Sequence, residues 1–160
     1  MYKLSILLIS FLFIACEKSP SVEVPAAHEL TRDANGYYCL MTVLNHKGPK
    51  GQIILTDNKV LWFTSVRDTI SFTLSPEEPK NIAAIYVNDM TDADWDNPGV
   101  DNWIDIHKAW FVLNSDRSGG MGTPETVPFS SKDNATLFVK QHGGSVVSYS
   151  MLPKEYIYLK

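Results

Sequence analysis

Cysteine is scarce in this chain of 160 residues, which has two, Cys16 and Cys39. Basic runs are absent, and no arginine-rich stretch alternates with aromatic residues, which argues against binding to nucleic acid. The most apolar stretch, residues 4–14, is too short to span a bilayer comfortably and is interrupted by serines. These absences leave an acidic protein with 18 acidic and 14 basic side chains.

Familiar catalytic motifs are missing too. The glycine-rich residues 119–122 follow a predicted strand but have no lysine and no helix after them, so they do not form a phosphate-binding loop. There is no G-x-S-x-G motif and no pair of histidines four residues apart. Acidic residues gather in residues 89–105, where a solvated acidic loop is a better interpretation than paired catalytic carboxylates. The sequence therefore does not predict an enzyme.

The first residues have the features of a bacterial lipoprotein signal. Lys3 precedes the apolar stretch, and Ala15 stands directly before Cys16. Cleavage at that point would remove residues 1–15 as a signal peptide and leave the Cys16 thiol for attachment of a lipid. Phe13 is bulkier than the usual leucine at its position, so an ordinary signal peptide that ends near a cysteine is the alternative.

The residues after Cys16 are expected to form a tether. Residues 16–35 are polar and contain prolines, which is typical of a linker between a lipid anchor and a folded domain. Glu17, directly after the anchor, favours the outer membrane over the inner one. Removing the signal leaves 13 basic against 18 acidic side chains, a net charge of about −5. With Cys16 lipidated, Cys39 has no partner for a disulfide within the chain, and an unpaired thiol in an oxidising periplasm is expected to be either buried or used.

Residues 36–160 are predicted to fold as an α+β domain. Apolar runs predict strands at 51–55, 59–63, 81–89, 109–113, 126–129 and 145–152, and helical spacing predicts helices at 65–74 and 131–144. The order ββαβ therefore occurs twice, in modules of about 36–90 and 104–160 that pack together. Residues 63–72 and 129–138 both begin and end with Phe around a serine cap, which favours an internal repeat. The acidic residues 90–105 between the modules are expected to wrap the surface.

Sulfur is the chemistry that remains. If residues 37–41 are extended, Cys39 and Met41 lie on the same face of a strand. A thiolate and a thioether together select Cu(I) over harder metals. Met121, which has glycines on both sides, is the best third ligand, whereas Met90 and Met151 are expected to be packing residues. The alternative is that Cys39 and Met41 are simply part of the core.

Several long segments resemble the NosL family, the accessory lipoproteins of nitrous oxide reductase. They include GYYCLMTVLNHKGPKGQI (36–53), WFTSVRD (62–68), EEPKNIAAIYVNDM (77–90) and the glycine-rich GGMG followed by PE and VPF. The resemblance extends from Gly36 to about Tyr149. By position, the family's C-x-M pair falls on Cys39 and Met41, and the methionine of its glycine-rich segment falls on Met121. His46 is the histidine to test as a further ligand.

This resemblance implies a membrane-anchored Cu(I) chaperone that faces the periplasm. It would deliver copper for the copper–sulfide centre of nitrous oxide reductase, with the reductase or its ABC-type assembly complex as partner. It also implies two ββαβ modules related to those of organomercurial lyase. Two other functions stay open at this point. One is a structural lipoprotein without a metal, and the other is a thiolate-dependent enzyme, although the mature chain has no second free cysteine for such chemistry.

Overall fold

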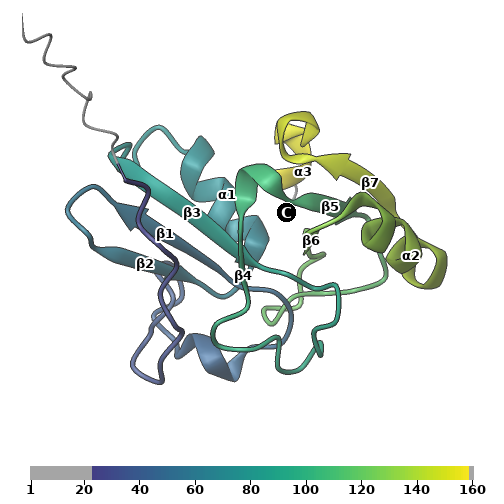
Figure 1. Ribbon diagram of the computed structural model, residues 1–160, viewed down its shortest axis with the longest axis horizontal. Helices are drawn as coiled ribbons and strands as arrows, with labels where there is room; N and C mark the ends of the chain where they lie inside the picture. The colour runs from purple at the N-terminus through teal and green to yellow at the C-terminus, as the bar shows by residue number, and fades with distance from the viewer. Residues whose placement is uncertain (1–22, 159–160) are drawn as a thin grey trace, which may run out of the picture.

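The computed structural model describes residues 23–158, which form two antiparallel sheets with helices packed on them (Figure 1). The first sheet has the strand order β2-β1-β3-β4, and the second has the order β6-β5-β7. The strands are β1 (Gly51–Leu55), β2 (Val60–Phe63), β3 (Ile82–Asn88), β4 (Trp103–Asp105), β5 (Trp110–Leu113), β6 (Val127–Phe129) and β7 (Ser145–Ser148). The helices are α1 (Val66–Leu74), α2 (Lys132–His142) and α3 (Lys154–Tyr158), with 3-10 turns η1 (Val43–Asn45), η2 (Ile106–Lys108) and η3 (Tyr149–Met151). The predicted α+β class is confirmed.

The two longer helices begin directly after a serine, as predicted. Ser65 Oγ accepts a hydrogen bond from the Asp68 N–H, and Ser131 Oγ accepts one from the Asn134 N–H. These caps satisfy N–H groups that have no partner within the first helical turn. After α2 the chain turns at Gly143, which has a φ of 69°. Glycine adopts this conformation without steric cost.

Each sheet contains one ββαβ unit. The first strand of the unit lies between the second and the third, so β1 lies between β2 and β3, and β5 lies between β6 and β7. In each unit the helix follows the second strand. The predicted element order is therefore present in both halves, while their origin from one repeated sequence stays a prediction.

One hydrophobic cluster joins the two units. Ile53 of β1 and Ile70 of α1 belong to the same buried cluster as Phe111 of β5, and Tyr156 and Ile157 of α3 complete it. The opposite face of β5 packs in a second cluster with α2, in which Val112 and Ala135 are buried. The two modules thus share a core, as predicted.

The C-terminal residues differ from the prediction. β7 ends at Ser148, and the residues that follow form the 3-10 turn η3 rather than more strand. Met151 is exposed, so its predicted packing role is wrong, whereas Met90 is buried as predicted. The short helix α3, which starts directly after Pro153, was not predicted because five residues carry too little periodicity.

Residues 90–105 do more than wrap the surface. Their last three residues form β4, in which Ile104 lies opposite Val87 of β3, and Pro98 is buried. A strand of three residues has no recognisable alternation of polar and apolar side chains, so the sequence does not reveal it.

Residues 23–35, here called the strap, lie on the first sheet (Figure 1, purple). The Gln52 side chain clasps the backbone of His28, accepting from its N–H at 2.8 Å and donating to its C=O at 2.9 Å. The Tyr86 hydroxyl donates to the Pro25 C=O at 2.7 Å. These residues, which the sequence assigns to the tether, therefore belong to the folded part.

The predicted signal peptide and Cys16 lie outside the described residues. Within residues 23–158, no helix has the length and apolar character needed to cross a membrane.

Candidate metal centre

Cys39 lies in a tight turn, the Cys39 turn (residues 36–41), and not in a strand. The Gly36 N–H donates to the Met41 C=O at 2.9 Å, and the Leu40 N–H donates to the Gly36 C=O at 2.8 Å. Leu40 has a φ of 58°, in the left-handed region that side chains other than glycine rarely adopt. The expected extended conformation is therefore wrong. No glycine or asparagine at position 40 signals the turn, yet Cys39 and Met41 remain together in it.

The Cys39 thiol is half-buried against the end of β2. Its Sγ lies 3.9 Å from Thr64 Oγ1, and a methyl group added at Gly36 would lie 2.5 Å from the same sulfur. The Tyr37 N–H donates to the Trp62 C=O at 2.7 Å, which attaches the turn to β2. Within residues 23–158, Cys39 forms no disulfide.

The glycine segment (residues 118–122) lies beside the start of α1. A side chain on Gly119 would collide with Glu125 Oε2 and would come within 3.8 Å of Ser65 Cβ. A side chain on Gly120 would lie 2.6 Å from His46 Cβ. Glycines are therefore required here by close approach, and Met121, between Gly120 and Gly122, is 48% exposed.

Two segments that carry predicted site residues approach the link between β2 and α1. Cys39 contacts Thr64 and the glycine segment reaches Ser65, and these two residues follow each other between β2 and α1. His46 packs on the glycine segment, and Met41 is 43% exposed on the Cys39 turn. The Cys39 turn and the glycine segment, which are far apart in the sequence, therefore approach two consecutive residues, Thr64 and Ser65. The role of each residue as a ligand stays a prediction.

The other histidines lie elsewhere. His107 is exposed, and its Nδ1 lies 3.1 Å from Asp105 Oδ1. His142 is partly buried, because its ring packs on Phe138 and its Nδ1 lies 3.0 Å from Asp116 Oδ1. Neither residue approaches the Cys39 turn through these contacts.

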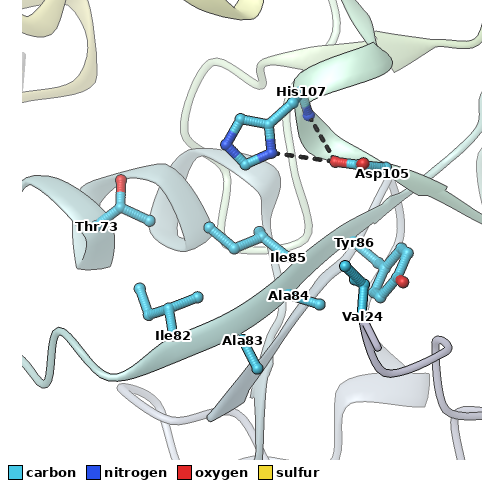
Figure 2. A pocket seen from close by; sticks show the side chains of 9 residues that line it. All are labelled: Val24, Thr73, Ile82, Ala83, Ala84, Ile85, Tyr86, Asp105 and His107. Atoms are coloured by element: carbon cyan, nitrogen blue, oxygen red, sulfur yellow. Dashed lines mark hydrogen bonds and ion pairs between the residues drawn. The ribbon is translucent and has the colours of Figure 1, made fainter. Parts of the chain in front are cut away.

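A groove of about 450 Å³ runs along β3 and is lined by its residues 82–86. Figure 2 shows His107 and Asp105 at one side of it, with Ile82, Ala84 and Tyr86 along the strand. Its lining has no sulfur-bearing side chain, so this groove is separate from the predicted copper ligands.

Two buried charged residues near the glycine segment escaped the sequence analysis. Glu125 Oε1 accepts from the N–H groups of Thr126 at 2.9 Å and Arg67 at 3.3 Å, so this carboxylate caps the start of α1. Lys50 is also buried, and its Nζ donates to the Gly48 C=O at 2.8 Å. The signal in the sequence was an acidic residue directly before a strongly apolar strand. Acidic side chains are otherwise rarely buried.

Burial dominates the ionisation of both residues. It raises the pKa of Glu125 to about 8, with nearby Asp68 acting in the same direction and the backbone hydrogen bonds acting against it. Burial also lowers the pKa of Lys50 to about 8, although the proximity of Glu125 partly opposes this shift. The glycine segment therefore rests on a group that is costly to ionise.

The donor set in this region is soft. Within residues 23–158, no three His, Cys, Asp or Glu side chains lie together in a way that could hold a metal ion. Cys39 and Met41 are the sulfur-bearing residues of the Cys39 turn, and a thiolate with a thioether favours Cu(I).

Comparison with known proteins identifies close relatives. A copper-binding lipoprotein NosL of Achromobacter cycloclastes is 44% identical over 140 residues, which cover 86% of this chain and 72% of that protein. Its counterpart from Stutzerimonas stutzeri is 29% identical over 133 residues, which cover 83% of this chain and 67% of that protein.

Solved structures agree. The crystal structure of the copper chaperone NosL from Shewanella denitrificans matches with a TM-score of 0.75 at 32% identity, covering 81% of this chain and 96% of that one. The solution structure of apo-NosL from Achromobacter cycloclastes matches with a TM-score of 0.52 at 45% identity, covering 68% and 88% respectively. Residues 27–157 match the sequence profile of the NosL family, which includes most of the strap. The chain therefore belongs to the NosL family.

Proposed function

We propose that this chain is a Cu(I) chaperone whose cargo is held by Cys39, Met41 and Met121. The observation that carries the proposal is the convergence of the Cys39 turn and the glycine segment on the adjacent residues Thr64 and Ser65. The copper-binding names of the curated relatives support it independently. His46, which packs against Gly120, is the candidate for a further ligand.

One thiolate and two thioethers suit the reduced ion. Soft sulfur ligands favour Cu(I), whereas Zn²⁺ sites in proteins are usually completed by histidine, further cysteines or carboxylates. The absence of a three-residue cluster of such donors in the described part of the chain supports copper over zinc. The oxidation state of the cargo rests on this donor chemistry.

Release of the cargo is favoured by the exposure of the thioethers. Met41 and Met121 are both close to half exposed, and Leu40 beside them is 79% exposed. A three-coordinate ion with ligands at the surface leaves an open position that a ligand from a receiving protein can attack. We expect the receiver to be nitrous oxide reductase, at its copper–sulfide centre, or its ABC-type assembly complex, with the acidic residues 89–105 as the docking region.

We also propose that the protein is anchored by a lipid on Cys16 and faces the periplasm, with the outer membrane as its location. The lipoprotein names of both curated relatives support the anchor. The sequence around Ala15 and Glu17 supports its position and its sorting.

A binding role accounts for the Cys39 environment better than catalysis does. The polar neighbour of the thiol is the Thr64 hydroxyl, and general acid–base chemistry would need a histidine or a carboxylate at that place. We therefore propose that the protein is not an enzyme.

The decisive experiment is an anaerobic Cu(I) titration of the chain truncated after Cys16, in competition with bathocuproine disulfonate. We expect one copper per chain and an absorption band from thiolate-to-copper charge transfer. Cys39→Ala should abolish the band and lower the affinity by orders of magnitude, and Met90→Leu, which alters a buried thioether outside the site, is the matched control. Undiminished affinity in Cys39→Ala would refute the site, and absence of binding by the unmodified chain would leave a structural lipoprotein.

A further inference from the structure

Two tyrosines next to Cys39 share one carboxylate. The Tyr37 hydroxyl donates to Glu78 Oε2 at 2.8 Å, and the Tyr38 hydroxyl donates to Glu78 Oε1 at 3.1 Å. Glu78 belongs to the loop after α1, about 40 positions away in the sequence. Each carboxylate oxygen thus holds one phenol, and hydrogen bonds to an ionised acceptor are stronger than those between neutral groups.

The phenol rings rest on the core. Tyr37 packs edge-on against Phe72 with ring centroids 5.2 Å apart, and Tyr38 packs in the same manner against Phe63 at 5.8 Å. Phe63 and Phe72 are fully buried. The rings are therefore positioned by rigid neighbours, and Glu78 fixes their outer ends.

The turn between these anchors is strained. Leu40 holds a left-handed backbone conformation although its side chain gains little by burial there. Such conformations persist where surrounding contacts over-determine them. At the base of the turn, Gly36 and Tyr37 supply backbone hydrogen bonds, and on its flank Glu78 supplies the contacts to side chains.

We infer that Glu78 is a positioning residue for the Cys39 thiolate, because it clamps both tyrosines that precede Cys39 and so holds the strained turn in its ligand-presenting shape. This inference rests on the proposed copper site, but its action on the thiol itself is independent of copper. Glu78 does not touch the cargo. It acts through Tyr37 and Tyr38.

The test uses the full chain with Cys16→Ser, so that Cys39 is the only thiol. Glu78→Ala is compared with Glu77→Ala, which removes the same charge from the same loop but contacts Ser75 instead of the tyrosines. Two rates are measured: reaction of the metal-free Cys39 thiol with a chromogenic disulfide, and transfer of Cu(I) to bathocuproine disulfonate. We expect Glu78→Ala to accelerate both about tenfold and Glu77→Ala to leave both within twofold of the unmodified rates.

Further variants separate positioning from a general loss of stability. Tyr37→Phe with Tyr38→Phe should reproduce Glu78→Ala, and the triple variant should add nothing further, because all three changes remove the same contacts. Glu78→Gln keeps one acceptor oxygen and should restore part of the effect. The charge-transfer band of the copper-loaded chain should shift in Glu78→Ala at temperatures where the fold is intact.

The outcomes are distinguishable. Equal rates in Glu78→Ala and Glu77→Ala would overturn the inference while leaving the copper site standing. If the unmodified chain takes up no Cu(I), the proposed function fails, and the disulfide reaction alone then decides whether Glu78 governs the thiol.

Discussion

Gly36→Ala is expected to displace the Cys39 sulfur without unfolding the protein. The added methyl carbon would lie 2.5 Å from Sγ, whereas the next contacts, with Thr64 Cγ2 and the Met41 carbonyl oxygen, would be 3.3 Å and 3.7 Å. Non-bonded heavy atoms are most stable at about 3.5–4.0 Å. The sulfur must therefore move by about 1 Å or rotate to another rotamer, while the other neighbours need little adjustment.

The expected loss follows from the importance of the thiolate in the proposed site. Changes that misplace a ligand from outside the coordination shell typically lower metal affinity 10–100-fold. This corresponds to about 1.4–2.8 kcal/mol of binding free energy. The free energy of unfolding should fall less, by about 1 kcal/mol, because the turn lies at the surface and not in the tightly packed core.

Both quantities are measured on the same preparation, by Cu(I) competition and by urea unfolding. The double variant Gly36→Ala with Cys39→Ala is the control, because the new methyl group then meets no sulfur and the unfolding penalty should largely disappear. Affinity within twofold of the unmodified chain, together with additive unfolding penalties, would show that the thiol does not lie against Gly36.

Glu125→Gln should weaken the pH dependence of the free energy of unfolding. Burial raises the pKa of Glu125 from 4.5 to about 8 in the folded state. The free energy of unfolding is therefore largest below pH 4.5 and declines as the pH rises towards 8. Between pH 5 and 7, where Lys50 is charged in both the folded and the unfolded state, this decline amounts to at most about 3 kcal/mol. An equal decline of the unfolding free energy in Glu125→Gln, measured with urea, would contradict this prediction. Leu40→Gly should raise the free energy of unfolding by about 1 kcal/mol, since it relieves a positive φ at an exposed side chain, and a lower urea midpoint would argue against the strain. Gly120→Ala should lower both the melting temperature and the Cu(I) affinity, because its methyl group collides with His46. Gly122→Ala meets no atom within 4 Å, so it should affect copper less, although the φ of 78° at Gly122 strains an alanine and should lower the melting temperature.

The regular elements were predictable because their patterns are local. The serine caps at Ser65 and Ser131 and the apolar run of β1 each lie within a few residues of the structure they specify. β1 is covered by the core on one face and by the strap on the other, which explains its run of apolar residues. Gln52 is the polar exception in this buried strand. That exception was informative, because the Gln52 side chain binds the strap.

The site could be located only in part. The sulfur residues are visible in the sequence, but the turn that presents Cys39 depends on a leucine in a conformation for which leucine has no preference. Contacts across long separations, such as Glu78 with the tyrosines and Glu125 with the Arg67 N–H, have no local signal at all. Their partners are set by tertiary packing, which single-sequence patterns do not encode.

The shared core limits how this protein can move. Ile53 and Phe111, from different sheets, belong to one buried cluster, so a hinge that separated the two modules would expose that cluster to water. Opening between lobes, which many binding proteins use to admit and discharge a ligand, is therefore a costly route for this fold. Exchange of cargo is therefore expected to use small displacements of the Cys39 turn and the glycine segment, while the two sheets stay in place. Amide hydrogen exchange should be rapid in these two segments and slow in β1 and β5.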